Sequence, residues 1–184
     1  MSDSRRDSQT SKRRERQKER FRDIMQDTEG NVIYTGAMHR IAGEEGHSAR
    51  VRMLVLLVIT AAIVISSGCI DAGGAMGAFY VIFPYIGEVS SLFALAWSAS
   101  KLFVPAEIRT YVLNQSGEKI PGACRMLSIF AIAGLILSAV YLMRNGMGGE
   151  PAKNILYLGL KLMAALAAEL FRKQYSVLKW EQSS

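Results

Sequence analysis

The sequence predicts an all-α integral membrane protein with four transmembrane helices. Half of its 184 residues are hydrophobic, and from Met53 onward long apolar runs alternate with short polar connections. Each run, with its flanks, has about the 20 residues that a helix needs to cross the hydrocarbon layer. None of the runs shows the strict alternation of a transmembrane β-strand. The predicted spans are residues 53–70, 77–102, 126–143 and 154–171.

Residues 1–21 are polar and dense in charge, which is typical of a disordered arm. An RNA-binding arm is the alternative, but Phe21 is its only aromatic residue and no folded RNA-binding module accompanies it. The charge therefore favours an anionic membrane leaflet as the partner, where each nearby basic residue contributes about 1 kcal/mol. The basic residues expected to face lipid are Lys12, Arg13, Arg14, Arg16, Lys18, Arg20 and Arg22.

Residues 22–52 form a juxtamembrane segment with one clear turn signal, Glu29-Gly30-Asn31. The residues that follow, Val32 to Thr35, favour a strand, so the segment predicts a small β-hairpin. An isolated hairpin is marginal in water. It would therefore rest on the membrane surface, on another loop of this chain or on a partner. An extended linker explains the same residues equally well, and both alternatives stay open.

The connections between the spans are short or carry helix signals. The glycine-rich stretch from Ile70 to Gly77 is short enough to make the first two spans an antiparallel pair. In the connection after the second span, Pro105 can begin a helix and Gly117 can end it. Ile108, Tyr111 and Val112 would share one face of it. This pattern predicts a helix that lies at the membrane interface.

Residues 172–184 continue the apolar stripe of the fourth span. Phe171, Tyr175 and Leu178 fall on one helical face, and Trp180 has the amphipathic ring that favours the membrane–water interface. We therefore expect the last helix to continue as an amphipathic tail.

The distribution of Lys and Arg predicts the orientation. Twelve of them precede the first span, four lie between Lys101 and Arg125, and three follow Phe171. The other two connections hold only Arg144 and Lys153. Because loops rich in Lys and Arg stay in the cytoplasm, both termini and the middle connection are expected there. We expect the protein to reside in the cell membrane, a plasma membrane of the bacterial type.

Small residues four positions apart let helices approach closely in lipid. Such pairs in three of the spans predict a compact bundle that could also associate with further copies. They are Ala94 with Ser98, Gly134 with Ser138, and Ala164 with Ala168.

Two charges fall inside predicted spans. Lys161 lies about 10 Å below the outer end of the fourth span, and Glu88 lies about 12 Å below the outer end of the second. Two opposite charges at similar depth predict an intramembrane ion pair. The alternative is that the lysine reaches out to the headgroups. Asp71, at the outer mouth, is a weaker third candidate, and Glu169 is expected in solvent beside Arg172.

The sequence carries no motif of an enzyme. It has no GxSxG or HExxH motif, no phosphate-binding glycine loop, and no Cys or His spacing typical of a metal site. We therefore expect no catalytic residues, no cofactor and no metal. The leading hypothesis is a non-enzymatic accessory, scaffold or assembly subunit that binds membrane proteins or its own copies. The alternative is a small oligomeric transporter or channel that uses Glu88 and Lys161.

Overall fold

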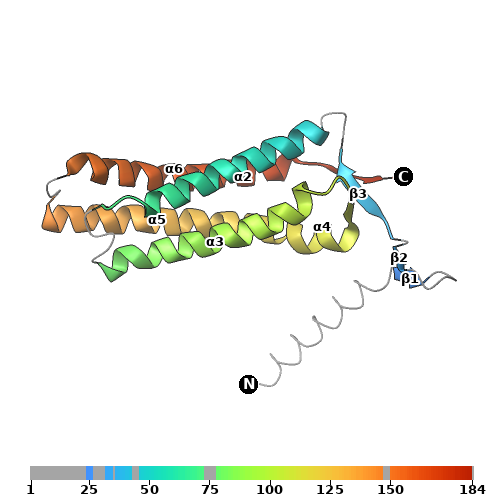
Figure 1. Cartoon of the computed structure of the whole chain (residues 1–184), viewed down its shortest axis with the longest axis horizontal. Helices are drawn as coiled ribbons and strands as arrows, with labels where there is room; N and C mark the ends of the chain where they lie inside the picture. Colours follow the sequence, from blue (N-terminus) through green and yellow to red (C-terminus); the bar gives the residue numbers. More distant parts are fainter. Residues whose placement is uncertain are drawn as a thin grey trace, which may run out of the picture.

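Four long helices form the body of the protein in the computed structural model (Figure 1). Each is long and apolar enough to cross a membrane. They are α2 (Gly46–Gly68), α3 (Phe79–Phe103), α5 (Lys119–Asn145) and α6 (Pro151–Val177). The structure describes residues 24–26, 32–34, 36–42, 46–72, 78–146 and 150–183.

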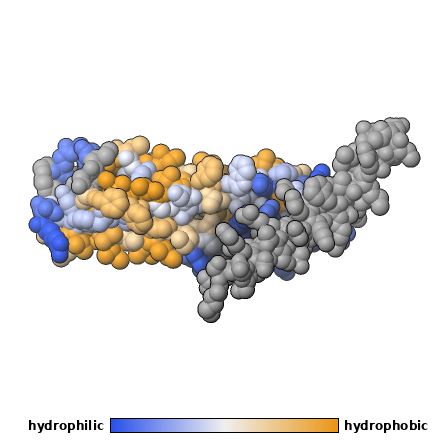
Figure 2. All heavy atoms as spheres, turned by 90° about the horizontal axis from the view of Figure 1, so that it is seen from below, coloured by the Kyte–Doolittle hydropathy of each residue, from blue (hydrophilic) through white to orange (hydrophobic). Residues whose placement is uncertain are grey.

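The four helices pack in a ring. Helix α2 contacts α3 and α6, and α5 contacts the same two helices from the other side. Helices α3 and α6 therefore occupy diagonal positions in the bundle. Large apolar side chains lie exposed along the outside of all four helices. Figure 2 shows this as a hydrophobic surface along the bundle, with hydrophilic residues toward its ends. This is the distribution that a lipid environment requires.

The helices extend beyond the apolar runs that predicted them. Helix α2 begins at Gly46 rather than at Met53, α5 begins at Lys119, and α6 continues to Val177. Hydropathy marks only the part of a helix that is apolar, whereas backbone hydrogen bonding continues into the polar flanks. The predicted helix from Pro105 to Gly117 is shorter than expected, because α4 spans only Thr110–Gly117.

Strands are present as well, so the all-α expectation was incomplete. Three of them form one antiparallel sheet in the order β4-β3-β5. They are β3 (Met38–Ile41), β4 (Ile108–Arg109) and β5 (Trp180–Ser183). The sheet thus joins three segments that are far apart in the sequence, and Figure 1 shows it at one end of the bundle. Residues 180–183, expected in an amphipathic tail, are a strand instead.

A second pair of strands precedes this sheet. Strand β1 (Ile24–Gln26) pairs antiparallel with β2 (Val32–Tyr34), with Met25 opposite Ile33. Of the two alternatives for this segment, the structure has the hairpin-like pairing. The expected turn at residues 29–31 and the basic arm, residues 1–21, lie outside the described residues.

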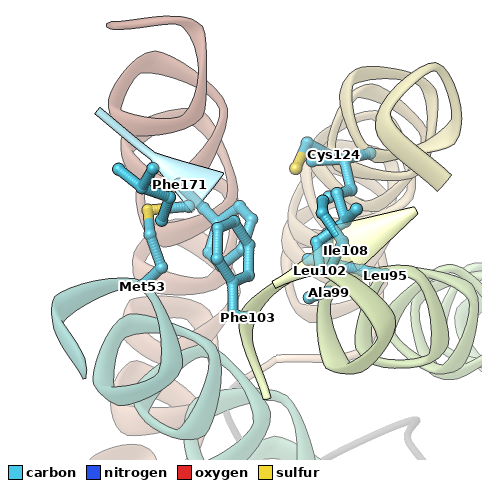
Figure 3. Close-up of a cluster of buried hydrophobic side chains, with 10 residues drawn as sticks. Met53, Leu95, Ala99, Leu102, Phe103, Ile108, Cys124 and Phe171 are labelled. Atoms are coloured by element: carbon cyan, nitrogen blue, oxygen red, sulfur yellow. The ribbon is translucent and has the colours of Figure 1, made fainter. Parts of the chain in front are cut away.

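A cluster of buried side chains from all four long helices also includes Ile41 of β3 and Ile108 of β4, so it joins the bundle to the sheet (Figure 3). Phe103, at the end of α3, is its centre. Its ring makes an edge-on contact with Phe171, at 6.4 Å between centroids, and stacks on Trp180 at the same distance. Trp180 is therefore partly buried and packs against the bundle.

Candidate functional site

Lys161 and Glu88 form an ion pair inside the bundle. The Nζ atom of Lys161 donates to both carboxylate oxygens of Glu88, at 2.8 Å and 2.9 Å. Both side chains are fully buried, with 0% exposed. Because Lys161 is on α6 and Glu88 is on α3, the pair joins the two diagonal helices across the centre of the bundle. The ammonium group is therefore buried against Glu88, whereas the alternative placed it in the headgroup region at the end of its helix.

Two tyrosine rings flank the ammonium group. Its Nζ atom lies 4.6 Å from the ring centroid of Tyr85 and 5.2 Å from that of Tyr157. Tyr85 precedes Glu88 by about one turn of α3, and Tyr157 precedes Lys161 by about one turn of α6. The faces of aromatic rings attract cations at these distances. The lysine charge is thus contacted by one carboxylate and two aromatic rings, and the role of the two tyrosines was not predicted.

Helix α5 contributes a glycine to the same site. A Cβ atom added to Gly134 would lie 3.1 Å from Oε1 of Glu88 and 3.7 Å from Cδ of Lys161. A side chain at this position would therefore need the Glu88 carboxylate to shift by a few tenths of an ångström. The sequence pattern identified Gly134 as a helix-contact residue, but nothing in that pattern connected it with the two charges.

The geometry of the pair determines what it can do. Isolated charges in a membrane interior are expensive, by at least about 2.5–3.5 kcal/mol on insertion scales. Here each charge neutralises the other, and neither is open to solvent. A closed pair of this kind holds α3 and α6 in one relative position.

The other candidate residues lie apart from this pair. Asp71 is exposed, beyond the end of α2. Glu169 is partly exposed and forms an ion pair with Arg172, at 2.7 Å from Nη2. It also accepts a hydrogen bond from Ser128 at 3.3 Å. Its carboxylate therefore has a second protein contact, whereas the sequence predicted a position in solvent. The seven basic residues from Lys12 to Arg22 lie outside the described residues.

The described part of the chain offers no metal site. None of its Asp, Glu, His and Cys side chains gather in a group of three or more that could hold a metal ion. Cys69 is an exposed free thiol and Cys124 is a buried one.

Four apolar helices around a buried charge pair define the class: a multi-pass membrane protein with a helical-bundle core. No protein-family model, no curated protein and no solved structure matches this chain. Its function is therefore inferred from its own contacts.

Proposed function

We propose that this protein is a non-enzymatic accessory, scaffold or assembly subunit that contacts other membrane proteins or copies of itself through one end. That end carries β3, β4, β5 and α4, which we call the platform. The observation behind the proposal is that the sheet gathers segments from three parts of the chain there. Among the described residues, the opposite end has only connections between helices. A stable complex with a partner protein needs a folded surface of sufficient area.

The charge pattern supports a cytoplasmic position for the platform. Strands β3, β4 and β5, which meet there, belong to the segments before α2, between α3 and α5, and after α6. In the sequence, these three segments together hold most of the lysines and arginines of the chain. By the positive-inside rule, this end faces the cytoplasm of a cell membrane, with both termini on that side. The basic arm would then lie near anionic lipids.

The closed ion pair supports a structural role for the bundle. A transport path needs charged groups that meet water or the transported ion, whereas Glu88 and Lys161 are both fully buried. The competing hypothesis, a small oligomeric transporter or channel, is favoured by one observation: ionisable residues inside spans commonly mark ion pathways. It would require the pair to open in a second conformation.

Site-specific photo-crosslinking in native membranes can separate the two functions. One crosslinking residue replaces Gln182, which is exposed on β5, and a control replaces Arg144, which is exposed at the other end of α5. The scaffold proposal expects a discrete adduct, with one membrane protein or with a second copy, from position 182 and none from 144.

Two results would contradict the proposal. One is the absence of any discrete adduct from position 182. The other is ion or solute flux by the purified protein alone in liposomes, abolished by Glu88→Gln in a variant that keeps the helical content of the parent. The second result would establish the transporter hypothesis instead.

A further inference from the structure

A cleft of about 620 Å³ opens at the platform end of the bundle. Its walls come from β3, the start of α2, the loop after α3, and β5. The charged and polar side chains that line it are Arg40, His47, Arg50, Glu107 and Glu181. The cleft therefore presents groups of both charges to one ligand-sized space.

The basic side of the cleft has donors suited to a phosphate group. Arg40 comes from β3, and His47 and Arg50 come from the first turns of α2. Arg50 is fixed by a hydrogen bond from Nη1 to the carbonyl oxygen of Pro105, at 2.9 Å. A guanidinium group has five N–H donors, so this bond leaves others for a ligand. The start of a helix adds a modest further preference for negative charge.

The acidic side of the cleft consists of Glu107 and Glu181. Arg40 and Glu181 are directly opposite each other across β3 and β5. No ion pair links either of them to another residue within the described ranges. Glu107 accepts a hydrogen bond from the hydroxyl of Ser183 through Oε1, at 2.6 Å.

The position of the cleft relative to the apolar surface indicates where its ligand comes from. Helix α2 passes directly from Arg50, in the cleft wall, to exposed apolar residues beginning with Val51 and Val55. This is the level at which lipid headgroups lie when α2 spans a bilayer. A lipid with its headgroup in the cleft could run its acyl chains along the apolar face of α2.

We propose that this cleft binds the phosphate–ammonium headgroup of an aminophospholipid, of the phosphatidylethanolamine type. The phosphate faces Arg40, His47 and Arg50, and the ammonium faces Glu107 and Glu181. A purely anionic headgroup would satisfy the basic residues but offer no cation to the two carboxylates that line the same cleft. The proposal requires α2 to span the membrane, but it does not depend on the scaffold function.

Native mass spectrometry of the full-length protein can test this preference. The protein is released from mixed micelles that hold equal amounts of phosphatidylethanolamine and phosphatidylglycerol with identical acyl chains. We expect one tightly retained lipid per chain, with phosphatidylethanolamine favoured roughly tenfold, the low end of what one additional hydrogen bond to a charged group would give.

Two variants test the assignment of the charges. Glu181→Gln should abolish the preference for phosphatidylethanolamine while lipid is still retained, and Arg40→Gln should reduce the retention of both lipids. Both residues are exposed, so backbone pairing of β3 with β5 should survive. Glu150→Gln, at the opposite end of the bundle, is the matched control and should change neither value. The ratio of the two lipids is read within one sample, so it remains informative if a variant loses stability.

The proposal is overturned if the wild-type protein retains both lipids equally, or if Glu181→Gln keeps the preference. Soluble phosphoethanolamine, titrated into lipid-depleted protein by calorimetry, distinguishes the two sources of the headgroup. Weak binding of the soluble compound, together with the lipid preference, supports a lipid ligand. Tight binding without any lipid preference would assign the cleft to a soluble ligand and reject the lipid.

Discussion

The free energy associated with the Glu88–Lys161 pair depends on which partner is removed. Both side chains have left water completely. Replacing a buried pair by apolar residues of similar size is often neutral, whereas removing one partner leaves an uncompensated charge and costs about 3–5 kcal/mol. The two single substitutions and the double substitution should therefore behave very differently.

A double-mutant cycle tests the coupling within the pair. Glu88→Gln and Lys161→Met should each lower the free energy of unfolding by about 3 kcal/mol, and the double variant should recover much of that loss. The measurement is denaturant unfolding of the detergent-solubilised protein. A coupling energy near zero would show that the two charges do not stabilise each other, and it would remove the pair as a link between α3 and α6.

Gly134→Ala tests how closely α5 packs on the pair. The added Cβ would lie 3.1 Å from Oε1 of Glu88, which Lys161 holds in place, so we expect a loss of about 1–3 kcal/mol. Gly159→Ala is the matched control, because a Cβ at Gly159 would meet nothing within 4 Å. Alanine has a higher helix propensity than glycine, so the control substitution should be neutral or should stabilise the protein by up to about 1 kcal/mol. Equal effects of the two substitutions would contradict the close packing.

At the scale of the elements, β5 depends on side chains as well as on backbone pairing. Trp180 lies at its start, opposite Ile41 of β3, and its ring stacks on Phe103. The same Phe103 ring contacts Tyr175 of α6 edge-on, at 6.4 Å between centroids. The sheet is therefore fixed to the bundle through one aromatic cluster.

Trp180→Ala should weaken this connection. We expect a loss of about 2 kcal/mol, because the ring is partly buried, and faster amide exchange in β3. Trp97→Ala is the control. Trp97 is 58% exposed, and its ring contacts Phe93 and Lys101, both on α3 itself, so its loss should leave exchange in β3 unchanged. Unfolding and hydrogen exchange in detergent provide both measurements. If exchange in β3 does not respond to Trp180→Ala, the aromatic cluster does not hold the sheet.

The long helices could be predicted from the sequence, but most of the strands could not. An apolar run of membrane length carries a strong signal, because in lipid only helices and closed barrels satisfy their backbone polar groups, and these runs lack the alternation of a barrel strand. Strand β4 has two residues and β5 has the sequence WEQS, so neither shows a strand pattern. Their pairing with β3 depends on contacts between distant segments, which no local window contains. The helix expected from Pro105 was misassigned for this reason, since Ile108 pairs with His39 instead.

The two charges could be predicted to meet because helix rise converts sequence position into depth. That calculation gives the depth of each residue in the membrane, but not the direction in which its side chain leaves the helix axis. It could not show that α3 and α6 are diagonal, or that Tyr85, Tyr157 and Gly134 surround the ammonium group. Both tyrosines do lie about one turn from a charged residue, and this spacing is a signal that could have identified them.

At the scale of the whole molecule, the platform end and the opposite end should lie on different sides of the membrane. Single cysteines at Glu118, beside the platform, and at Glu150, at the other end, provide a matched pair, since both residues are exposed. Cys69 and Cys124 are first replaced by alanine. In intact cells, an impermeant thiol reagent should label position 150 and leave position 118 unlabelled until the cells are opened. The reverse pattern, or labelling of both, would contradict the cytoplasmic position of the platform.

The central place of β3 in its sheet has a consequence for the synthesis of the protein. Strand β3 is made before any of the four long helices, β4 follows α3, and β5 follows α6. One edge of β3 therefore stays open on the ribosome until the last of these helices has been translated. A chain whose α6 failed to insert would keep that edge exposed, and open strand edges invite aggregation. Closure of the sheet by β5 would thus mark the chains in which membrane insertion has been completed.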